Sequence, residues 1–119
     1  MTRKRKNRRI HKLPPVNEFL PKNGHTKLSP VTLTLDEYET IRLMDLEGFS
    51  QAECSMAMDI ARSTVQQIYA RARKKLAEAI VLGKPFKIDG GNCEMCDGHC
   101  EFCKNDVWAN TKTACIQPE

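Results

Sequence analysis

The sequence lacks the features of a membrane-spanning or secreted protein. None of its apolar runs approaches the roughly 20 residues that a membrane helix needs. Its basic N-terminus is not followed by the apolar segment of a secretory signal. These absences predict a cytoplasmic protein that makes no use of a membrane. Of the 119 residues, 40% are hydrophobic and 29% are charged, so a small soluble core is expected.

The features of an enzyme are also scarce. Gly90 and Gly91 are adjacent but lack the lysine and the spacing of a phosphate-binding loop. The three histidines, His11, His25 and His99, are scattered and lie mostly in segments that we expect to be flexible. The sequence therefore predicts no catalytic residues and no enzymatic activity.

The sequence is rich in charged residues, and its basic and acidic residues are segregated into separate blocks along the chain. Residues 1–12 contain seven lysines and arginines and no acid, and residues 61–87 carry a net charge of +6. Residues 36–60, between these blocks, carry −6. Two basic blocks that share one face of the fold would attract a polyanion. A membrane surface is a weaker alternative, because the first block has neither an apolar stripe nor a lipidation signal.

The composition divides the chain into three parts. Residues 1–33 form a basic arm and a proline-rich connector, residues 34–88 a helical domain, and residues 89–119 a cysteine-rich tail. We expect the arm to be disordered on its own, because its like charges repel each other and it has little apolar surface to bury. The connector contains four of the six prolines and is expected to be extended and rich in turns.

Two helices are predicted in the first half of the domain. The first begins near Thr34 and ends at Gly48, and its acidic first turn suits the positive end of the helix dipole. The second begins at Ser50, whose side chain forms a capping box with Glu53, and it runs to about Met58. The acidic residues of the first turn are Asp36, Glu37 and Glu39.

A longer third helix completes the predicted domain. It starts near Arg62 or Ser63, directly after a short turn, and Gly83 is its C-terminal stop. Its apolar residues recur at helical spacing from Val65 to Ile80. A short helix, a tight turn and a longer helix make a helix-turn-helix pattern. The predicted fold class is therefore all-α, a three-helix helix-turn-helix domain with a basic arm and a small cysteine-rich tail.

The helix-turn-helix pattern predicts recognition of double-stranded DNA. The leading end of a recognition helix touches base edges in the major groove, where Arg suits guanine and Gln suits adenine. The alternative is a solvated helix face in a small protein-interaction domain. The candidate base-reading residues are Arg62, Ser63, Thr64, Gln66 and Gln67. The candidate phosphate contacts are Arg71, Arg73, Lys74 and Lys75.

The basic arm extends this prediction. An Arg-rich extension next to a helix-turn-helix can enter the adjacent minor groove. The alternative for a charge run by itself is a solubilising tail or a non-specific polyanion contact. The candidate residues of the arm are Arg3, Lys4, Arg5, Lys6, Arg8 and Arg9.

Clustered cysteines predict a metal site in the tail. Cys93, Cys96, Cys100 and Cys103 form two C-x-x-C pairs, which together supply the four thiolates of a tetrahedral zinc site. The three-residue spacer between the pairs is shorter than in a usual zinc ribbon, so an iron–sulfur cluster is the alternative to the preferred zinc. Disulfides or unligated thiols are the alternatives without a metal.

Three further residues bear on the cysteine site. His99 is an alternative ligand, which we interpret as a bystander. Cys54 falls in the second helix and is interpreted as a small buried hydrophobic residue. Cys115 is either a separate thiol or an exchanging fifth ligand.

Several segments together match a known family. They are the Arg-Lys-rich arm, the proline-rich connector and the runs Leu33–Glu39, Arg42–Leu43, Asp45–Gly48, Ser50–Gln51, Arg62–Thr64, Ala72–Lys75, Gly83–Lys84 and Ile88–Asn92. Over roughly residues 3–92 the chain resembles domain-of-unknown-function family 134. Its members are small prokaryotic proteins predicted to bind DNA through a helix-turn-helix similar to region four of sigma factors. The resemblance implies this fold and a DNA partner.

The chain departs from the family pattern at three positions. Ala61 stands where a serine cap is common, which should weaken the start of the third helix by about 1 kcal/mol. Asp59 stands where a glycine is common, and aspartate can adopt the left-handed conformation of such a turn. Asn7 stands where a cysteine is common in the arm, so we expect the metal site of this chain to come wholly from its tail.

These observations combine into one functional prediction. The protein is expected to be a sequence-specific DNA-binding transcriptional regulator whose four-cysteine site holds structural zinc or a sensing iron–sulfur cluster. Two rival hypotheses are an adaptor that binds RNA polymerase and a metal-handling protein without specific DNA binding. A homodimer is left open, since many helix-turn-helix proteins bind DNA as dimers.

Overall fold

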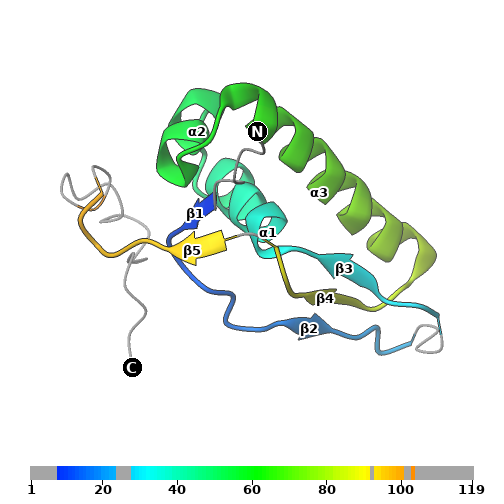
Figure 1. Ribbon diagram of the computed structural model, residues 1–119. Helices are drawn as coiled ribbons and strands as arrows, with labels where there is room; N and C mark the ends of the chain where they lie inside the picture. The colour runs from blue at the N-terminus through cyan, green and yellow to red at the C-terminus, as the bar shows by residue number, and fades with distance from the viewer. Residues whose placement is uncertain (1–7, 24–27, 92, 101–102, 104–119) are drawn as a thin grey trace, which may run out of the picture.

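The computed structural model describes residues 8–23, 28–91, 93–100 and 103. Within these residues, three α-helices and a π-helical segment lie against five short strands in two sheets (Figure 1). The fold is therefore mixed α/β, and the all-α prediction is wrong. The helices are α1 (Leu35–Ile41), α2 (Gln51–Met58) and α3 (Arg62–Leu82), and the strands are β1 (Arg8–Ile10), β2 (Glu18–Phe19), β3 (Val31–Leu33), β4 (Phe86–Ile88) and β5 (Cys93–Met95).

The strands join segments that are far apart in the sequence. β4 is the centre of a three-stranded sheet, antiparallel to β2 and parallel to β3. β1 and β5 form a separate parallel pair in which Arg8 lies opposite Cys93. Each strand has only two or three residues, whereas a strand is recognised from a run of roughly four to eight residues. The sequence pattern missed them for this reason.

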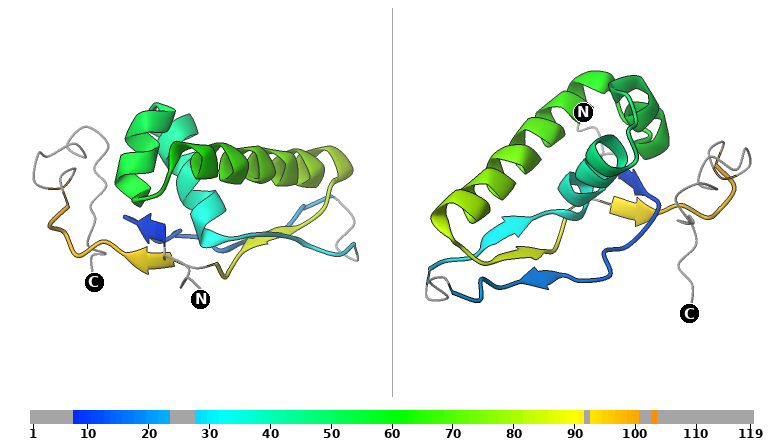
Figure 2. Two further views of the ribbon diagram at one scale, coloured as in Figure 1. Left: turned by 45° about the horizontal axis from the view of Figure 1, so that its top comes forward. Right: turned by 180° about the vertical axis from the view of Figure 1, so that it is seen from behind.

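Helices and strands form two layers (Figure 2). A hydrophobic cluster between α1, α3 and the three-stranded sheet contains Leu33, Ala72 and Ile88. A second cluster, at the α2 end of the molecule, includes buried residues from α2 and α3 and two cysteines that follow β5. Its members are Leu43, Cys54, Ala57, Met58, Val65, Cys96 and Cys100. None of the helices in the described part of the chain has the length and hydropathy that a membrane crossing requires.

The ends of α2 and α3 confirm the local predictions. The Ser50 Oγ accepts the Glu53 backbone N–H at 3.1 Å, and the Glu53 carboxylate accepts the Ser50 N–H at 2.8 Å. Asp59 ends α2 in the left-handed conformation, with φ of 59°. Ala61 begins α3 without a side-chain cap, as expected for alanine. These contacts involve near neighbours in sequence, which is why the sequence predicts them.

The predicted first helix is not regular throughout. After Ile41 it continues as η1 (Arg42–Leu46), a π-helical segment in which the Glu47 N–H donates to the Arg42 carbonyl. A π-turn inserts one residue into the helical repeat. Arg42 and its neighbour Leu43 are both buried in this segment.

The burial of Arg42 creates a small ionic network inside the protein. Its guanidinium makes two 3.0 Å contacts with Glu39 and one with Glu47. The Glu39 carboxylate also accepts the backbone N–H of His11 at 2.8 Å. Glu39 therefore anchors a buried arginine and the N-terminal segment, and the interpretation of Glu39 through the helix dipole alone was wrong.

Candidate functional site

The predicted DNA-contacting side chains that belong to α3 lie on the side of this helix away from the core. Four of the five candidate base-reading residues are exposed, and Thr64 is half-buried. The opposite face of the helix contributes Val65 and Ile68 to the core, both with no exposed surface. The exposed candidates at the start of α3 are Arg62, Ser63, Gln66 and Gln67.

α2 is held in place against this part of α3. Only residues 59–61 separate the two helices, and the Gln66 side-chain amide donates to the Gln51 side chain at 2.9 Å. Because Gln51 is the first residue of α2, this contact joins the start of α2 to the second turn of α3. The exposed end of α3 is thereby held by its neighbours before any ligand binds.

The candidate phosphate contacts differ in their surroundings. Lys74 is exposed. Arg71, whose side chain is 53% exposed, lies 3.4 Å from the Glu37 carboxylate, and Lys75 lies 2.8 Å from the same group. Burial alone would raise the pKa of Glu37, but hydrogen bonds from Lys75 and Thr34 outweigh burial and lower it. The basic face of α3 therefore retains positive charge beside one neutralising carboxylate.

The described part of the basic arm is folded into the protein. Arg8 and Arg9 belong to β1, and the Arg9 guanidinium donates to the carbonyls of Met56 and Ala57, each at 2.9 Å. Arg8 lies 3.5 Å from the Asp36 carboxylate, although its Nε makes no hydrogen bond. The side chains of Arg8 and Arg9 therefore both make contacts within the protein. Arg3, Lys4, Arg5 and Lys6 lie outside the described residues.

A potential metal site lies beside the end of α2. One ligand atom from each of His11, Cys96 and Cys100 lies within 4.8 Å of the others, and all three residues are buried. The Cys103 Sγ is 3.4 Å from the Cys100 Sγ. Cys103 is disulfide-bonded in the structure, so it can act as a ligand only when reduced. The cluster thus combines one imidazole with the three last cysteines of the predicted set.

His11 is the residue that the sequence analysis missed. It follows β1 directly, as Cys96 follows β5, and the Cys96 N–H donates to the carbonyl of Ile10 at 2.8 Å. The β1–β5 register therefore brings residues 11 and 96 together across most of the chain. The arm was expected to be flexible, and nothing in the local sequence signals this contact.

The His11 ring is neutral at ordinary pH. Burial, together with the charges of Arg42 and Arg9, lowers the pKa of His11 to about 3. Its Nε2 lies 3.1 Å from the carbonyl oxygen of Ala57. A carbonyl oxygen only accepts hydrogen bonds, so Nε2 carries the proton and Nδ1 carries the lone pair that a metal requires.

Among the described residues, Cys54, Cys93 and His99 lie outside this cluster. Cys93 is half-buried in β5, and burial and the Asp36 carboxylate raise the pKa of its thiol to about 12. Cys54 is fully buried in the core, as expected. His99 is exposed, and Cys115 lies outside the described residues.

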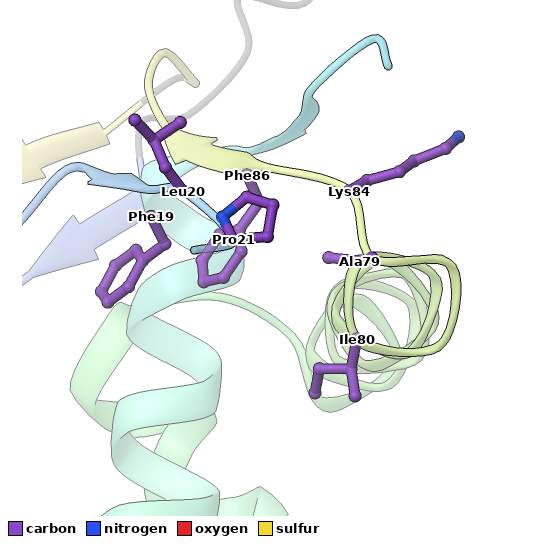
Figure 3. A pocket seen from close by; sticks show the side chains of 8 residues that line it. Phe19, Leu20, Pro21, Ala79, Ile80, Lys84 and Phe86 are labelled. Carbon is purple, nitrogen blue, oxygen red and sulfur yellow. The ribbon is translucent and has the colours of Figure 1, made fainter. Parts of the chain in front are cut away.

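A surface pocket of about 260 Å³ lies at the opposite end of α3 (Figure 3). Phe19 and Phe86 stack on one side of it with ring centroids 4.6 Å apart, and Ile80 lies on the other. Ile80 is 76% exposed, so its predicted place on the buried face of α3 was wrong. The pocket is mainly apolar, and none of its lining residues belongs to the predicted DNA-binding or metal-binding residues. The homodimer that the sequence left open stays a prediction.

Comparisons with known proteins match most of the chain. The sequence model described as "Protein of unknown function DUF134" matches residues 1–96. A UPF0251 protein of Desulfitobacterium hafniense strain Y51 is 52% identical over 99 residues, covering 82% of this chain and 79% of that protein. A UPF0251 protein of Clostridium tetani is 36% identical over 115 residues, covering 94% and 78%. No solved structure matches the chain.

Proposed function

This chain belongs to the DUF134 family of proteins of unknown function, and from that premise we propose that it is a sequence-specific DNA-binding protein that regulates transcription. One observation carries the proposal. α2 is joined by three residues to α3, whose leading turns expose arginine, serine and glutamine side chains while the opposite face is buried. This is the arrangement by which a helix can enter a major groove.

The exposed side chains have the chemistry for reading bases. Arg62 offers the paired donors that suit guanine, and Gln67 offers the donor and acceptor that suit adenine. Ser63 suits either a base or a phosphate. Gln66 is engaged with Gln51, so we assign it to holding the two helices together as well as to the DNA surface.

Basic residues farther along α3 would set the position of the protein on the duplex. Lys74 and Arg71 lie on the exposed face, where they can contact phosphates without reading sequence. Arg3, Lys4, Arg5 and Lys6 retain the minor-groove role predicted from the sequence. Arg8 and Arg9 are left out of the interface, because their side chains contact Asp36 and the end of α2.

Selection from random duplexes, followed by titration of the selected site, tests the proposal. Arg62→Ala and Gln67→Ala should each lower affinity for the selected site by about 1–3 kcal/mol, or roughly 5- to 150-fold. They should change affinity for random DNA far less. Lys22→Ala is the matched control. Lys22 is an exposed basic residue next to Pro21, which lines the pocket at the C-terminal end of α3, far from the proposed base-reading residues. Its loss should leave the ratio of specific to random affinity unchanged.

The same titration separates the proposal from its rival. If wild-type protein bound the selected and random duplexes equally well, base reading would be excluded. The rival hypothesis, that the protein is an adaptor that binds RNA polymerase, would then explain the exposed face of α3 better. Measurements at two salt concentrations are needed, because phosphate contacts alone give salt-dependent affinity without specificity.

A further inference from the structure

We propose that His11, Cys96, Cys100 and Cys103 bind one Zn²⁺ ion, with His11 taking the place predicted for Cys93, and that this ion fastens the two outer segments of the chain to the end of α2. The inference concerns a site outside the DNA-contacting face and does not depend on the proposed function. It rests on the placement of the four side chains, on their backbone contacts and on their burial.

The distances suit a tetrahedral ion. With Zn–S near 2.3 Å and Zn–N near 2.0 Å, tetrahedral geometry places two sulfur ligands about 3.8 Å apart and a sulfur and a nitrogen ligand about 3.5 Å apart. The Cys100 and Cys103 sulfur atoms are 3.4 Å apart. The ligand atoms of His11, Cys96 and Cys100 lie within 4.8 Å of one another, so modest side-chain movements would bring them onto one ion.

Backbone amides already support two of the sulfur atoms. The Gly98 N–H donates to the Cys96 Sγ, and the Cys103 N–H donates to the Cys100 Sγ, each at 3.4 Å. Gly98 has a φ of 90°, which a residue with a side chain rarely adopts, and this allows the chain to turn back over Cys96. Hydrogen bonds donated to sulfur stabilise the thiolate form that a metal requires.

His11 makes the kind of hydrogen bond that metal-ligating histidines commonly make. A ligating histidine donates its other ring N–H to a carbonyl or a carboxylate, which sets the tautomer and the ring orientation. The carbonyl of Ala57 occupies this position, 3.1 Å from Nε2. The ligand set of one imidazole and three thiolates is typical of structural zinc, whereas iron–sulfur clusters are usually held by four thiolates.

The ion would act on the junction between α2 and α3. Cys96 and Cys100 pack in the same cluster as Ala57, Met58 and Val65. β1 and β5 lie side by side beneath this junction (Figure 1). A bound ion would therefore join the segment after β1 to the segment after β5 and hold both against the turn that positions α3. Metal bound only by the folded protein adds its binding free energy to folding.

Metal analysis and cobalt substitution of the full-length protein test the site. The protein is purified with a reductant that keeps Cys103 as a thiol. We expect one zinc per chain, and Co²⁺ replacing it should give the visible bands of tetrahedral coordination with sulfur charge transfer. His11→Gln, whose amide can still donate to the Ala57 carbonyl, should weaken metal binding by tenfold or more. Cys93→Ser, the matched control, should keep full zinc content and the wild-type cobalt spectrum.

Two further measurements keep the test decisive. His11→Cys replaces imidazole by a fourth thiolate and should retain cobalt with stronger charge transfer, which a purely structural histidine would not produce. Removal of zinc with a chelator should lower the melting temperature of wild type by more than that of His11→Gln, because the variant holds the ion less tightly. Wild-type metal affinity in His11→Gln together with weakened affinity in Cys93→Ser would restore the four-cysteine set. Iron with sulfide, or no metal in reduced protein, would also overturn the proposal.

Discussion

Three charged residues with buried side chains, Glu39, Arg42 and Glu47, form a connected network of ion pairs. Glu39 has no exposed surface, and its carboxylate contacts the Arg42 guanidinium and the backbone N–H of His11. Glu47 completes the shell around Arg42. Charges removed from water are tolerated only when each one is paired, so the loss of any partner leaves the others desolvated. These residues therefore hold the N-terminal segment on the helices.

Replacing Arg42 by methionine should destabilise the protein strongly. The substitution leaves Glu39 and Glu47 buried without their cation, which costs about 3–5 kcal/mol for a buried pair. Chemical denaturation monitored by circular dichroism measures the loss. Lys84→Met, which breaks the partly exposed pair between Lys84 and Glu78, is the control and should change the free energy of unfolding much less. Similar losses in both variants would contradict the role of Arg42.

Glu37 should make stability depend on pH. Its side chain is 2% exposed, and contacts with Lys75 and Thr34 lower its pKa below the usual value of 4.5. The ionised form therefore stabilises the fold above about pH 4.5, and this contribution is lost as the pH falls through the lower pKa of the folded state.

The Glu37→Gln variant isolates this effect. At pH 7 it should be less stable than wild type by about 1–3 kcal/mol, because hydrogen bonds to a charged group are lost. Urea denaturation across the acidic range should show this gap closing below pH 4.5. A gap that stayed constant with pH would show that the Glu37 charge is not responsible.

Secondary-structure elements are defined in this protein mainly by their ends. The capping box of α2, the left-handed Asp59 and the left-handed Gly83 delimit α2 and α3 through contacts within a few residues. The start of α3 is the weakest of these ends, since Ala61 leaves it without a side-chain cap. The helix that carries the proposed DNA contacts thus begins with an unfilled capping position.

Ala61→Ser should strengthen that start. Ala61 has the extended backbone of an N-cap, with φ of −72° and ψ of 153°, so a serine hydroxyl can accept a free N–H of the first turn. The free energy of unfolding should rise by about 1 kcal/mol. Ala70→Ser makes the same change on an exposed position inside α3, where it should slightly destabilise the helix. If both variants lost stability, the capping argument would be wrong.

At the scale of the whole molecule, the N-terminal and C-terminal segments that contain β1 and β5 pack against the helices. β1 and β5 pair with each other, and Arg9 and His11 donate hydrogen bonds to the last carbonyls of α2. Cys96 and Cys100 complete the hydrophobic cluster under the α2–α3 turn. Segments assigned to an arm and a tail thus supply part of the core on which the helices rest.

A fragment of residues 34–88 should therefore be much less stable than the full chain. It lacks β1, β2, β3 and β5, the hydrogen bonds from Arg9 and His11 to the end of α2, and the buried Cys96 and Cys100. We expect loss of a cooperative thermal transition, measured by circular dichroism and by amide dispersion in NMR spectra. A fragment of residues 8–103 retains these contacts and should unfold cooperatively. A 34–88 fragment that melted like the full chain would show that the helices fold independently.

Local sequence determined the helical part of this protein. The Ser50–Glu53 box, the aspartate at 59, the glycine at 83 and the spacing of Val65 and Ile68 each act over one or two turns. Such interactions depend only on neighbouring residues, so their pattern can be read without the fold. Cys96, Cys100 and Cys103, the closely spaced cysteines of the candidate metal site, were predicted in the same way.

Tertiary structure decided the rest. The pairing of β1 with β5 sets His11 opposite Cys96 and leaves Cys93 beside Asp36, and the π-turn buries Arg42 against Glu39. Strands of three residues have almost no periodicity, and their register depends on what the helices bury above them. Contacts across 85 positions arise only when the chain packs, which is why the fourth candidate ligand emerged from the fold and not from the cysteine spacing.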